Sequence, residues 1–313
     1  MRRAEVSRHH REYEEEVETV SAIRALLAGV VDYAGLFPPA GLDMGVAVHN
    51  YASYRGHDES WMLGRFVVPV ARLDELSAQL RALGAQAAPA WRLSALLGAD
   101  IEADVERARK FNREHQGRAG VDTLEGKLDA GDAIRRVAAV AGREFAVFAE
   151  IPPDADVESF VAAAKDARIN VKIRTGGVTA DAFPPPAAVV RFIRCCIASG
   201  VRFKATAGLH HAIRGEYRLA YDAAAASGTM FGFLNVLLTA ALMAHGLTDT
   251  DALELLDERD PGAFTTTPAT ICWRRSTLDA EQARSTRDHL IVSIGSCSFI
   301  EPVDELRSLR MLP

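Results

Sequence analysis

Two lysines, Lys172 and Lys204, lie in similar apolar stretches, VKIRTGG and VRFKATAG. If these stretches form neighbouring strands, both amines lie at similar depth on one face of a sheet. Two ammonium groups in one pocket repel each other, and a low dielectric strengthens that repulsion. One lysine should then lose its proton near neutral pH, with its pKa falling from ~10.4 to ~7–8. Because a neutral amine attacks carbonyl carbon, the pattern predicts Schiff-base chemistry.

Two carboxylates accompany these lysines on neighbouring apolar stretches. Glu150 ends FAVFAE, and Glu125 lies within GVDTLEGK. Side chains alternate along a strand, so Phe148 and Glu150 share one face, as do Glu125 and Lys127. The glutamates are therefore candidates to move a proton, directly or through water. In the alternative interpretation, the two lysines form inert structural ion pairs with them.

Polar and glycine-rich segments that follow the strands predict a site for the substrate. Backbone amides in glycine loops hold phosphate or carboxylate, and arginine or histidine can add charge-assisted hydrogen bonds. The candidate substrate-binding residues are Arg174, Thr175, Gly176, Gly177, Thr206, Gly208, His210, His211 and Asn235.

The elements that must position these residues alternate between strand and helix. We expect strands at 30–36, 66–70, 91–97, 120–127, 145–151, 170–175, 201–206 and 229–236, with helical periodicity between them. Eight such steps predict a (β/α)8 TIM-type barrel over residues 1–245, with an N-terminal helix at 11–28. Residues 246–313 do not continue the repeat, so they are expected to form a C-terminal α+β extension packed on the barrel. No GxGxxG follows an early strand, which disfavours a Rossmann fold.

Composition narrows the classes of partner and compartment. The net charge of −6 disfavours nucleic acid and anionic membranes as partners. The four cysteines form no CxxC pair, which favours a reducing cytoplasm over a disulfide framework. The first twenty residues have no apolar core of signal-peptide type. The extension is a candidate contact in a homo-oligomer.

Residues 169–236 resemble the class I aldolases of the deoxyribose-phosphate aldolase group. The resemblance rests on VKIRTGG, FKATAGLHHAIR and SGTMFGFLN. It implies that Lys172 is the Schiff-base lysine, that Lys204 keeps it neutral, and that Gly176, Gly208 and Gly228 hold phosphate. Arg174 departs from the family pattern, which has a small hydroxyl residue there. Two other segments, VDYAGLFPPAG and GSCSFIEPVDEL, look like signatures of a bacterial family with no assigned activity.

Three functions follow from these patterns. The leading one is an aldolase-type lyase that acts on a small anionic carbonyl compound and needs no cofactor, with Arg174 and His210 or His211 gripping the anion. In the second, Glu125, Glu150 and Asp32 bind a divalent metal, and Lys172 or Lys204 stabilises an enolate. In the third, the chain is a non-catalytic binding or assembly protein. A metal between carboxylates at the strand ends would favour the second function, and a shallow mouth with both lysines salt-bridged would favour the third.

Overall fold

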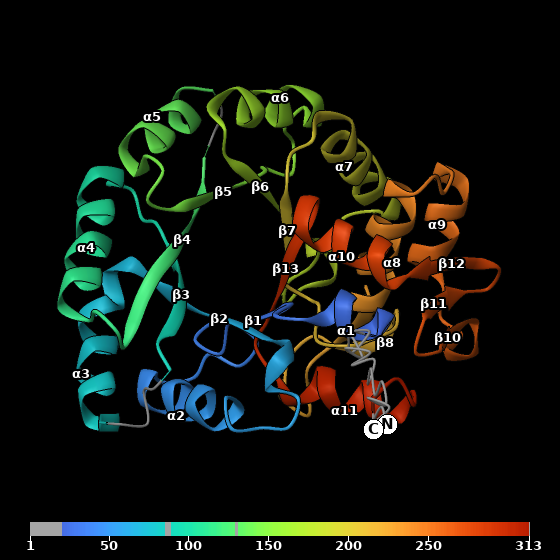
Figure 1. The fold of residues 1–313 in the computed structure, drawn as a ribbon, viewed down its shortest axis with the longest axis horizontal. Helices are drawn as coiled ribbons and strands as arrows, with labels where there is room; N and C mark the ends of the chain where they lie inside the picture. The colour runs from blue at the N-terminus through green and yellow to red at the C-terminus, as the bar shows by residue number, and fades with distance from the viewer. Residues whose placement is uncertain (1–20, 85–88, 129–130, 313) are drawn as a thin grey trace, which may run out of the picture.

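The computed structural model describes residues 21–84, 89–128 and 131–312. Eight parallel strands close into a barrel in the order β1-β13-β7-β6-β5-β4-β3-β2 (Figure 1). The predicted TIM-type fold is therefore confirmed. The barrel strands are β1 (Val31–Tyr33), β2 (Leu63–Pro69), β3 (Trp91–Leu96), β4 (Ala119–Lys127), β5 (Ala146–Glu150), β6 (Asn170–Arg174), β7 (Phe203–Thr206) and β13 (Ile291–Ser296).

Helices surround the barrel and cover its apolar outer face (Figure 1). In the described part of the chain, no helix is both long and apolar enough to cross a bilayer. The helices are α1 (Ala22–Leu27), α2 (Met44–Tyr54), α3 (Leu73–Leu83), α4 (Ile101–Glu114), α5 (Gly131–Ala141), α6 (Val157–Ala167), α7 (Pro186–Ser199), α8 (Phe233–Ala244), α9 (Asp249–Asp257), α10 (Ala280–His289) and α11 (Ile300–Ser308). Helix α1 covers the end of the helix expected at 11–28, whose first part lies outside the described residues.

Local sequence signals set the ends of the helices that flank the lysine-bearing strands. The Asp156 side chain caps the start of α6, and Pro186 occupies the first turn of α7, where no backbone N–H donor is needed. Helix α7 ends at Gly200, whose φ of 65° suits a residue without a Cβ. The chain then turns directly into β7, which sets the depth at which Lys204 enters the barrel.

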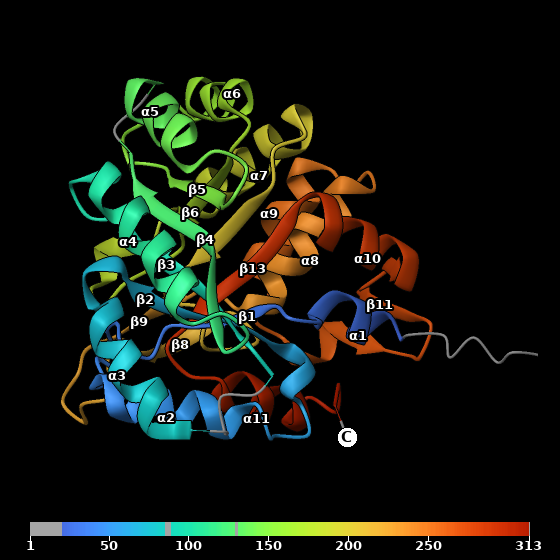
Figure 2. The ribbon, with the colours of Figure 1, turned by 60° about the vertical axis from the view of Figure 1, so that its left-hand side comes forward.

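The eighth strand of the barrel is β13, and the predicted strand at 229–236 is wrong. Residues 227–230 form β9, which pairs with β8 (Gly215–Arg218) in a hairpin outside the barrel. Residues 233–244 form the buried helix α8. The prediction failed because a short apolar run fits a buried strand and a buried helix equally well. Figure 2 shows β13 crossing the molecule beside β7.

The predicted division at residue 245 therefore cuts through the barrel, since β13 belongs to residues 246–313. The rest of that segment does pack against the barrel helices as expected, with α9 against α7 and α8. It also contributes an antiparallel sheet made of β10 (Phe264–Thr266), β11 (Thr270–Trp273) and β12 (Ser276–Asp279).

Strand register brings the predicted reactive residues together. Lys172 pairs with Lys204 across β6 and β7, and with Glu150 across β5 and β6. Lys204 pairs with Ser293 of β13. The closing strand thus lies directly beside the second lysine.

We predict that a chain ending at residue 245 does not fold cooperatively. It would lack β13 and expose the hydrogen-bonding edges of both β1 and β7. Near-UV circular dichroism and urea unfolding check this. As the matched control, residues 246–313 are added as a separate chain, which should restore the cooperative unfolding transition. A 1–245 fragment that unfolds with the midpoint of the full chain would contradict this role for β13.

Candidate functional site

A cavity of about 620 Å³ opens at the C-terminal ends of the barrel strands. Its volume lies in the range of pockets that bind small molecules. The walls are largely apolar and include Phe37, Pro38, Leu96, Leu97 and Val178. The charged residues gather on the floor and at the rim, so a ligand would meet polar groups at two depths.

The floor holds five charged groups, Asp32, Glu125, Glu150, Lys172 and Lys204, which we call the ion cluster. All five side chains are buried. Three carboxylates face two ammonium groups, so the cluster carries one net negative charge when every member is ionised. The predicted inward orientation of these residues on β1, β4, β5, β6 and β7 is confirmed.

Lys172 lies between two carboxylates. Its Nζ is 2.9 Å from Glu125 Oε2 and 2.8 Å from Glu150 Oε2. Its side chain is 5% exposed and that of Glu150 is 7% exposed. Lys172 and Glu150 are therefore the lysine and the carboxylate of the cluster that a molecule in the cavity reaches most directly.

Lys204 lies deeper and also bridges two carboxylates. Its Nζ is 2.6 Å from Asp32 Oδ2 and forms a second ion pair with Glu125. Glu125 thus binds both lysines, one through each oxygen, and accepts a further hydrogen bond of 2.6 Å from the Ser94 hydroxyl. The Phe148 ring lies beneath Lys204, with its centroid 5.4 Å from Nζ.

Asp32 is held by donors from two other strands. The Arg65 backbone N–H donates to Oδ1 at 2.7 Å, and the Ser293 hydroxyl of β13 donates to Oδ2 at 2.7 Å. Gly64 leaves room for this carboxylate, because a Cβ there would lie 2.4 Å from Asp32 Oδ1. The closing strand and a glycine on β2 therefore fix the deep acid.

The charges of the cluster determine which of its members are protonated. Burial alone would raise the pKa of Glu125, but Lys172 and Lys204 outweigh it and hold that pKa well below its usual range. Burial alone would lower the pKa of Lys172, but Glu125 and Glu150 outweigh it and raise the pKa. The predicted neutral Lys172 is therefore wrong for the resting site. The two carboxylates outweigh the repulsion between the lysines, so the charge of Lys172 agrees with the alternative interpretation, in which the lysines form ion pairs with the glutamates.

Five of the predicted substrate-binding residues line the cavity: Arg174, Gly177, Thr206, Gly208 and His210. Burial lowers the pKa of His210 to about 4, with a smaller contribution from His211. Its ring is therefore neutral at physiological pH and does not supply positive charge to an anion. It contacts Ser296 Oγ and Cys297 Sγ instead.

Four other predicted binding residues do not line the cavity. The Thr175 hydroxyl donates to the Ala207 carbonyl at 2.8 Å, and Gly176 packs against the Phe183 ring. His211 pairs with Glu305 and stacks on Tyr217. Asn235 lies in α8, where its amide donates to the carbonyls of Leu255 and Glu258. These contacts fix the loops and helices around the site, and Asn235 was misplaced together with the wrong eighth strand.

One charged residue of the cavity wall, Lys127, was not among the predicted site residues. Lys127 lines the cavity near its exposed rim, two residues beyond Glu125 on the same face of β4. Strand alternation had placed it inward, and that was the signal for it. Ser94 and Ser293, which hold the carboxylates, gave no comparable signal because serine is common on any strand.

The predicted metal alternative receives no geometric support. In the ranges that the structure describes, no group of three or more His, Cys, Asp or Glu side chains is placed to hold a metal ion. Asp32, Glu125 and Glu150 each contact a lysine ammonium. Of the two features expected for a non-catalytic protein, the salt-bridged lysines are present, whereas the barrel mouth is a cavity of about 620 Å³ and is not shallow.

Sequence comparison gives no family assignment: no protein-family model and no curated protein matches the chain.

We predict that Lys204→Met destabilises the fold by about 3–5 kcal/mol at pH 7, because Lys172 alone would then face three buried carboxylates. Glu125 would lose one of the two cations that lower its pKa, so it would take up a proton at higher pH than in the wild type. The loss should therefore shrink as the pH falls from about 7 to 5. Urea unfolding across that range measures it.

The control is Lys110→Met on α4. That lysine is 61% exposed, and its pair with Glu114 lies on the surface. Its replacement should change the stability by less than about 0.5 kcal/mol at every pH. Equal losses for the two variants, or a Lys204→Met loss independent of pH, would contradict the coupling within the cluster.

Proposed function

We propose that this protein is an aldolase-type lyase that binds a small anionic carbonyl compound as an iminium on Lys172. The observation that carries the proposal is the position of Lys172 Nζ between Glu125 and Glu150 on the floor of the cavity. Lys172 is chosen over Lys204 because it lies closer to the opening and because Glu150, its partner, contacts a single lysine among the described residues.

The resting cation on Lys172 is compatible with this chemistry. An iminium carries one positive charge, as the lysine ammonium does. Replacing the ammonium by an iminium leaves the net charge of the ion cluster unchanged, so Glu125 and Glu150 would stabilise both species. Groups that are already oriented toward a developing charge stabilise it without reorganisation.

The proton must leave Lys172 before the amine attacks. Glu150 is the acceptor, because the two lysines keep Glu125 ionised. Transfer from the ammonium to Glu150 yields a neutral amine and a neutral acid, a pair that a substrate-filled, water-poor cavity favours over two charges. The amine then adds to the carbonyl carbon, and the Glu150 acid protonates the departing hydroxyl, which leaves as water.

The iminium then acts as an electron sink for the neighbouring carbon–carbon bond. Glu150, ionised again, takes the proton from a hydroxyl on the far carbon of that bond. The bond then breaks, which releases the far carbon as a carbonyl fragment and leaves an enamine on Lys172. Proton addition to the enamine carbon regenerates an iminium, and water hydrolyses it to the second fragment and the lysine ammonium. Glu150 lies within reach to move the proton in both steps. The expected resemblance to class I aldolases agrees with this sequence of steps and stays a prediction.

Borohydride trapping tests the proposal. Small aldehydes and ketones carrying a carboxylate or phosphate should give reduced adducts that peptide mass spectrometry places on Lys172. Because Glu125 and Glu150 raise the pKa of Lys172, the adduct rate should keep rising between about pH 7 and 10. Lys172→Arg, which keeps the charge but offers no amine nucleophile, should lose the adduct, whereas Lys165→Arg on α6 should retain it. Adducts confined to other lysines would overturn the proposal.

Glu150→Gln tests the proton acceptor. The amide keeps the shape of the side chain but can neither take the Lys172 proton nor protonate the departing hydroxyl. Trapping at pH 7 should therefore slow about a hundredfold, even though loss of the carboxylate lowers the pKa of Lys172. Near-UV circular dichroism verifies that the variant is folded. An unchanged trapping rate would show that the proton leaves Lys172 by another route.

A further inference from the structure

A second set of polar side chains lies further along the strands toward the opening of the cavity, and one of them, Lys127, is also the register partner of Glu150. On β4, β6 and β7, the residue two positions after a cluster member also lines the cavity: Lys127 follows Glu125, Arg174 follows Lys172, and Thr206 follows Lys204. Residues i and i+2 share one face of a strand. We call Lys127, Arg174 and Thr206 the mouth layer.

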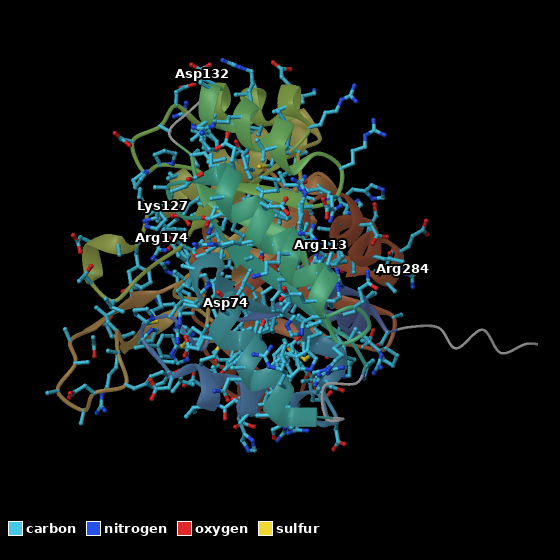
Figure 3. The ribbon with its side chains drawn as sticks, turned by 90° about the vertical axis from the view of Figure 1, so that its left-hand side faces the viewer. Asp74, Arg113, Lys127, Asp132, Arg174 and Arg284 are labelled. Atoms are coloured by element: carbon cyan, nitrogen blue, oxygen red, sulfur yellow. The ribbon has the colours of Figure 1, made fainter. Side chains whose placement is uncertain are left out.

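The mouth layer has the opposite charge to the floor. It holds two cations and no acid, whereas the fully ionised cluster carries a net negative charge. Both Lys127 and Arg174 are exposed, and neither forms an ion pair with any acid that the structure describes. The Arg174 guanidinium donates a weak hydrogen bond of 3.3 Å to the Gly176 carbonyl. Figure 3 shows the two side chains at the same edge of the molecule.

Thr206 provides an independent observation. It is the register partner of Arg174 across β6 and β7. Its hydroxyl oxygen is buried and has no hydrogen-bond partner among the described residues. A buried polar atom without a partner is costly. Because Thr206 lines the cavity, rotation of its side chain would bring this hydroxyl to a ligand oxygen.

We propose that the mouth layer is a clamp for a carboxylate or phosphate that is remote from the reacting carbonyl of the substrate. Lys127 and Arg174 supply charge, and the Thr206 hydroxyl donates a hydrogen bond. Two residues along a strand span roughly 6.6 Å, so the Cα atoms of Arg174 and Thr206 are displaced by about that much along their strands from those of Lys172 and Lys204. The clamp therefore selects carbonyl compounds whose anion is several bonds away, and it disfavours 2-oxo acids, whose carboxylate is bonded to the carbonyl carbon.

That the bound anion belongs to a substrate rests on the proposed lyase function. Anion binding by the mouth layer can be tested without any lysine chemistry. Inorganic phosphate and acetate are titrated separately into ¹⁵N-labelled full-length protein, and the shifts of the Lys127, Arg174 and Thr206 amides are followed. At least one anion should shift these signals saturably, and the stronger binder identifies the preferred group. Arg174→Gln and Lys127→Gln should each weaken binding about tenfold.

The matched control is Arg284→Gln on α10, which removes the same charge. Figure 3 shows Arg284 on the opposite side of the molecule from Lys127 and Arg174. Its affinity for the anions should equal that of the wild type. Absence of saturable binding, shifts centred elsewhere, or equal affinities for Arg174→Gln and Arg284→Gln would each overturn the clamp.

The rates of borohydride trapping then test the distance between the carbonyl carbon and the anionic group. With borohydride, 4-oxobutanoate should label Lys172 about tenfold faster than either uncharged butanal or a 2-oxo acid, and Arg174→Gln should abolish that preference. A faster 2-oxo acid would overturn the distance argument. If the anions bind as predicted and no carbonyl compound labels Lys172, the lyase proposal fails while the clamp stands.

Discussion

Two ammonium groups on adjacent strands inside a barrel require carboxylates on the surrounding strands, and this constraint organises the site. A buried charge is tolerated only when it is paired and hydrogen-bonded. Each lysine contacts two carboxylates, and Glu125 contacts both lysines. The acids come from β1, β4 and β5, so the cluster assembles only when strands distant in the sequence close into one barrel. The closing strand, β13, also orients Asp32 through Ser293.

The same constraint gives the site its chemical character. Because Glu125 and Glu150 surround Lys172, the floor is built to hold a cation, and the proposed iminium is a cation of equal charge. The unfavourable step precedes iminium formation, because the Lys172 ammonium must first give up a proton. Lys127 and Arg174 above the floor add charge of the opposite sign to the net charge of the cluster. A molecule with an electrophilic carbon at one end and an anion at the other fits both layers.

Much of this was predictable from residue order, and the failures have physical reasons. Strand alternation alone turned Glu125, Glu150, Lys172 and Lys204 toward one cavity, since the period of two is fixed by the backbone. The eighth strand was misassigned because the apolar run at 229–236 has no periodicity that separates a buried strand from a buried helix. The sequence left two interpretations open for Lys172, a neutral amine or an ion-paired ammonium, because the choice depends on its distances to Glu125 and Glu150 across strands. The anion-gripping role expected for His210 failed similarly, since burial keeps its ring neutral.

The proposed chemistry depends most on the charge of Lys172 in the resting protein. Side-chain NMR of ¹⁵N-lysine-labelled protein measures it directly, with the signal assigned by its loss in Lys172→Arg. Because Glu125 and Glu150 raise the pKa of Lys172, its Nζ should keep the ammonium chemical shift past pH ~10.4, the midpoint of an ordinary lysine. A titration midpoint near pH 7–8 would contradict the account, because it would mean that repulsion from Lys204 outweighs the two carboxylates.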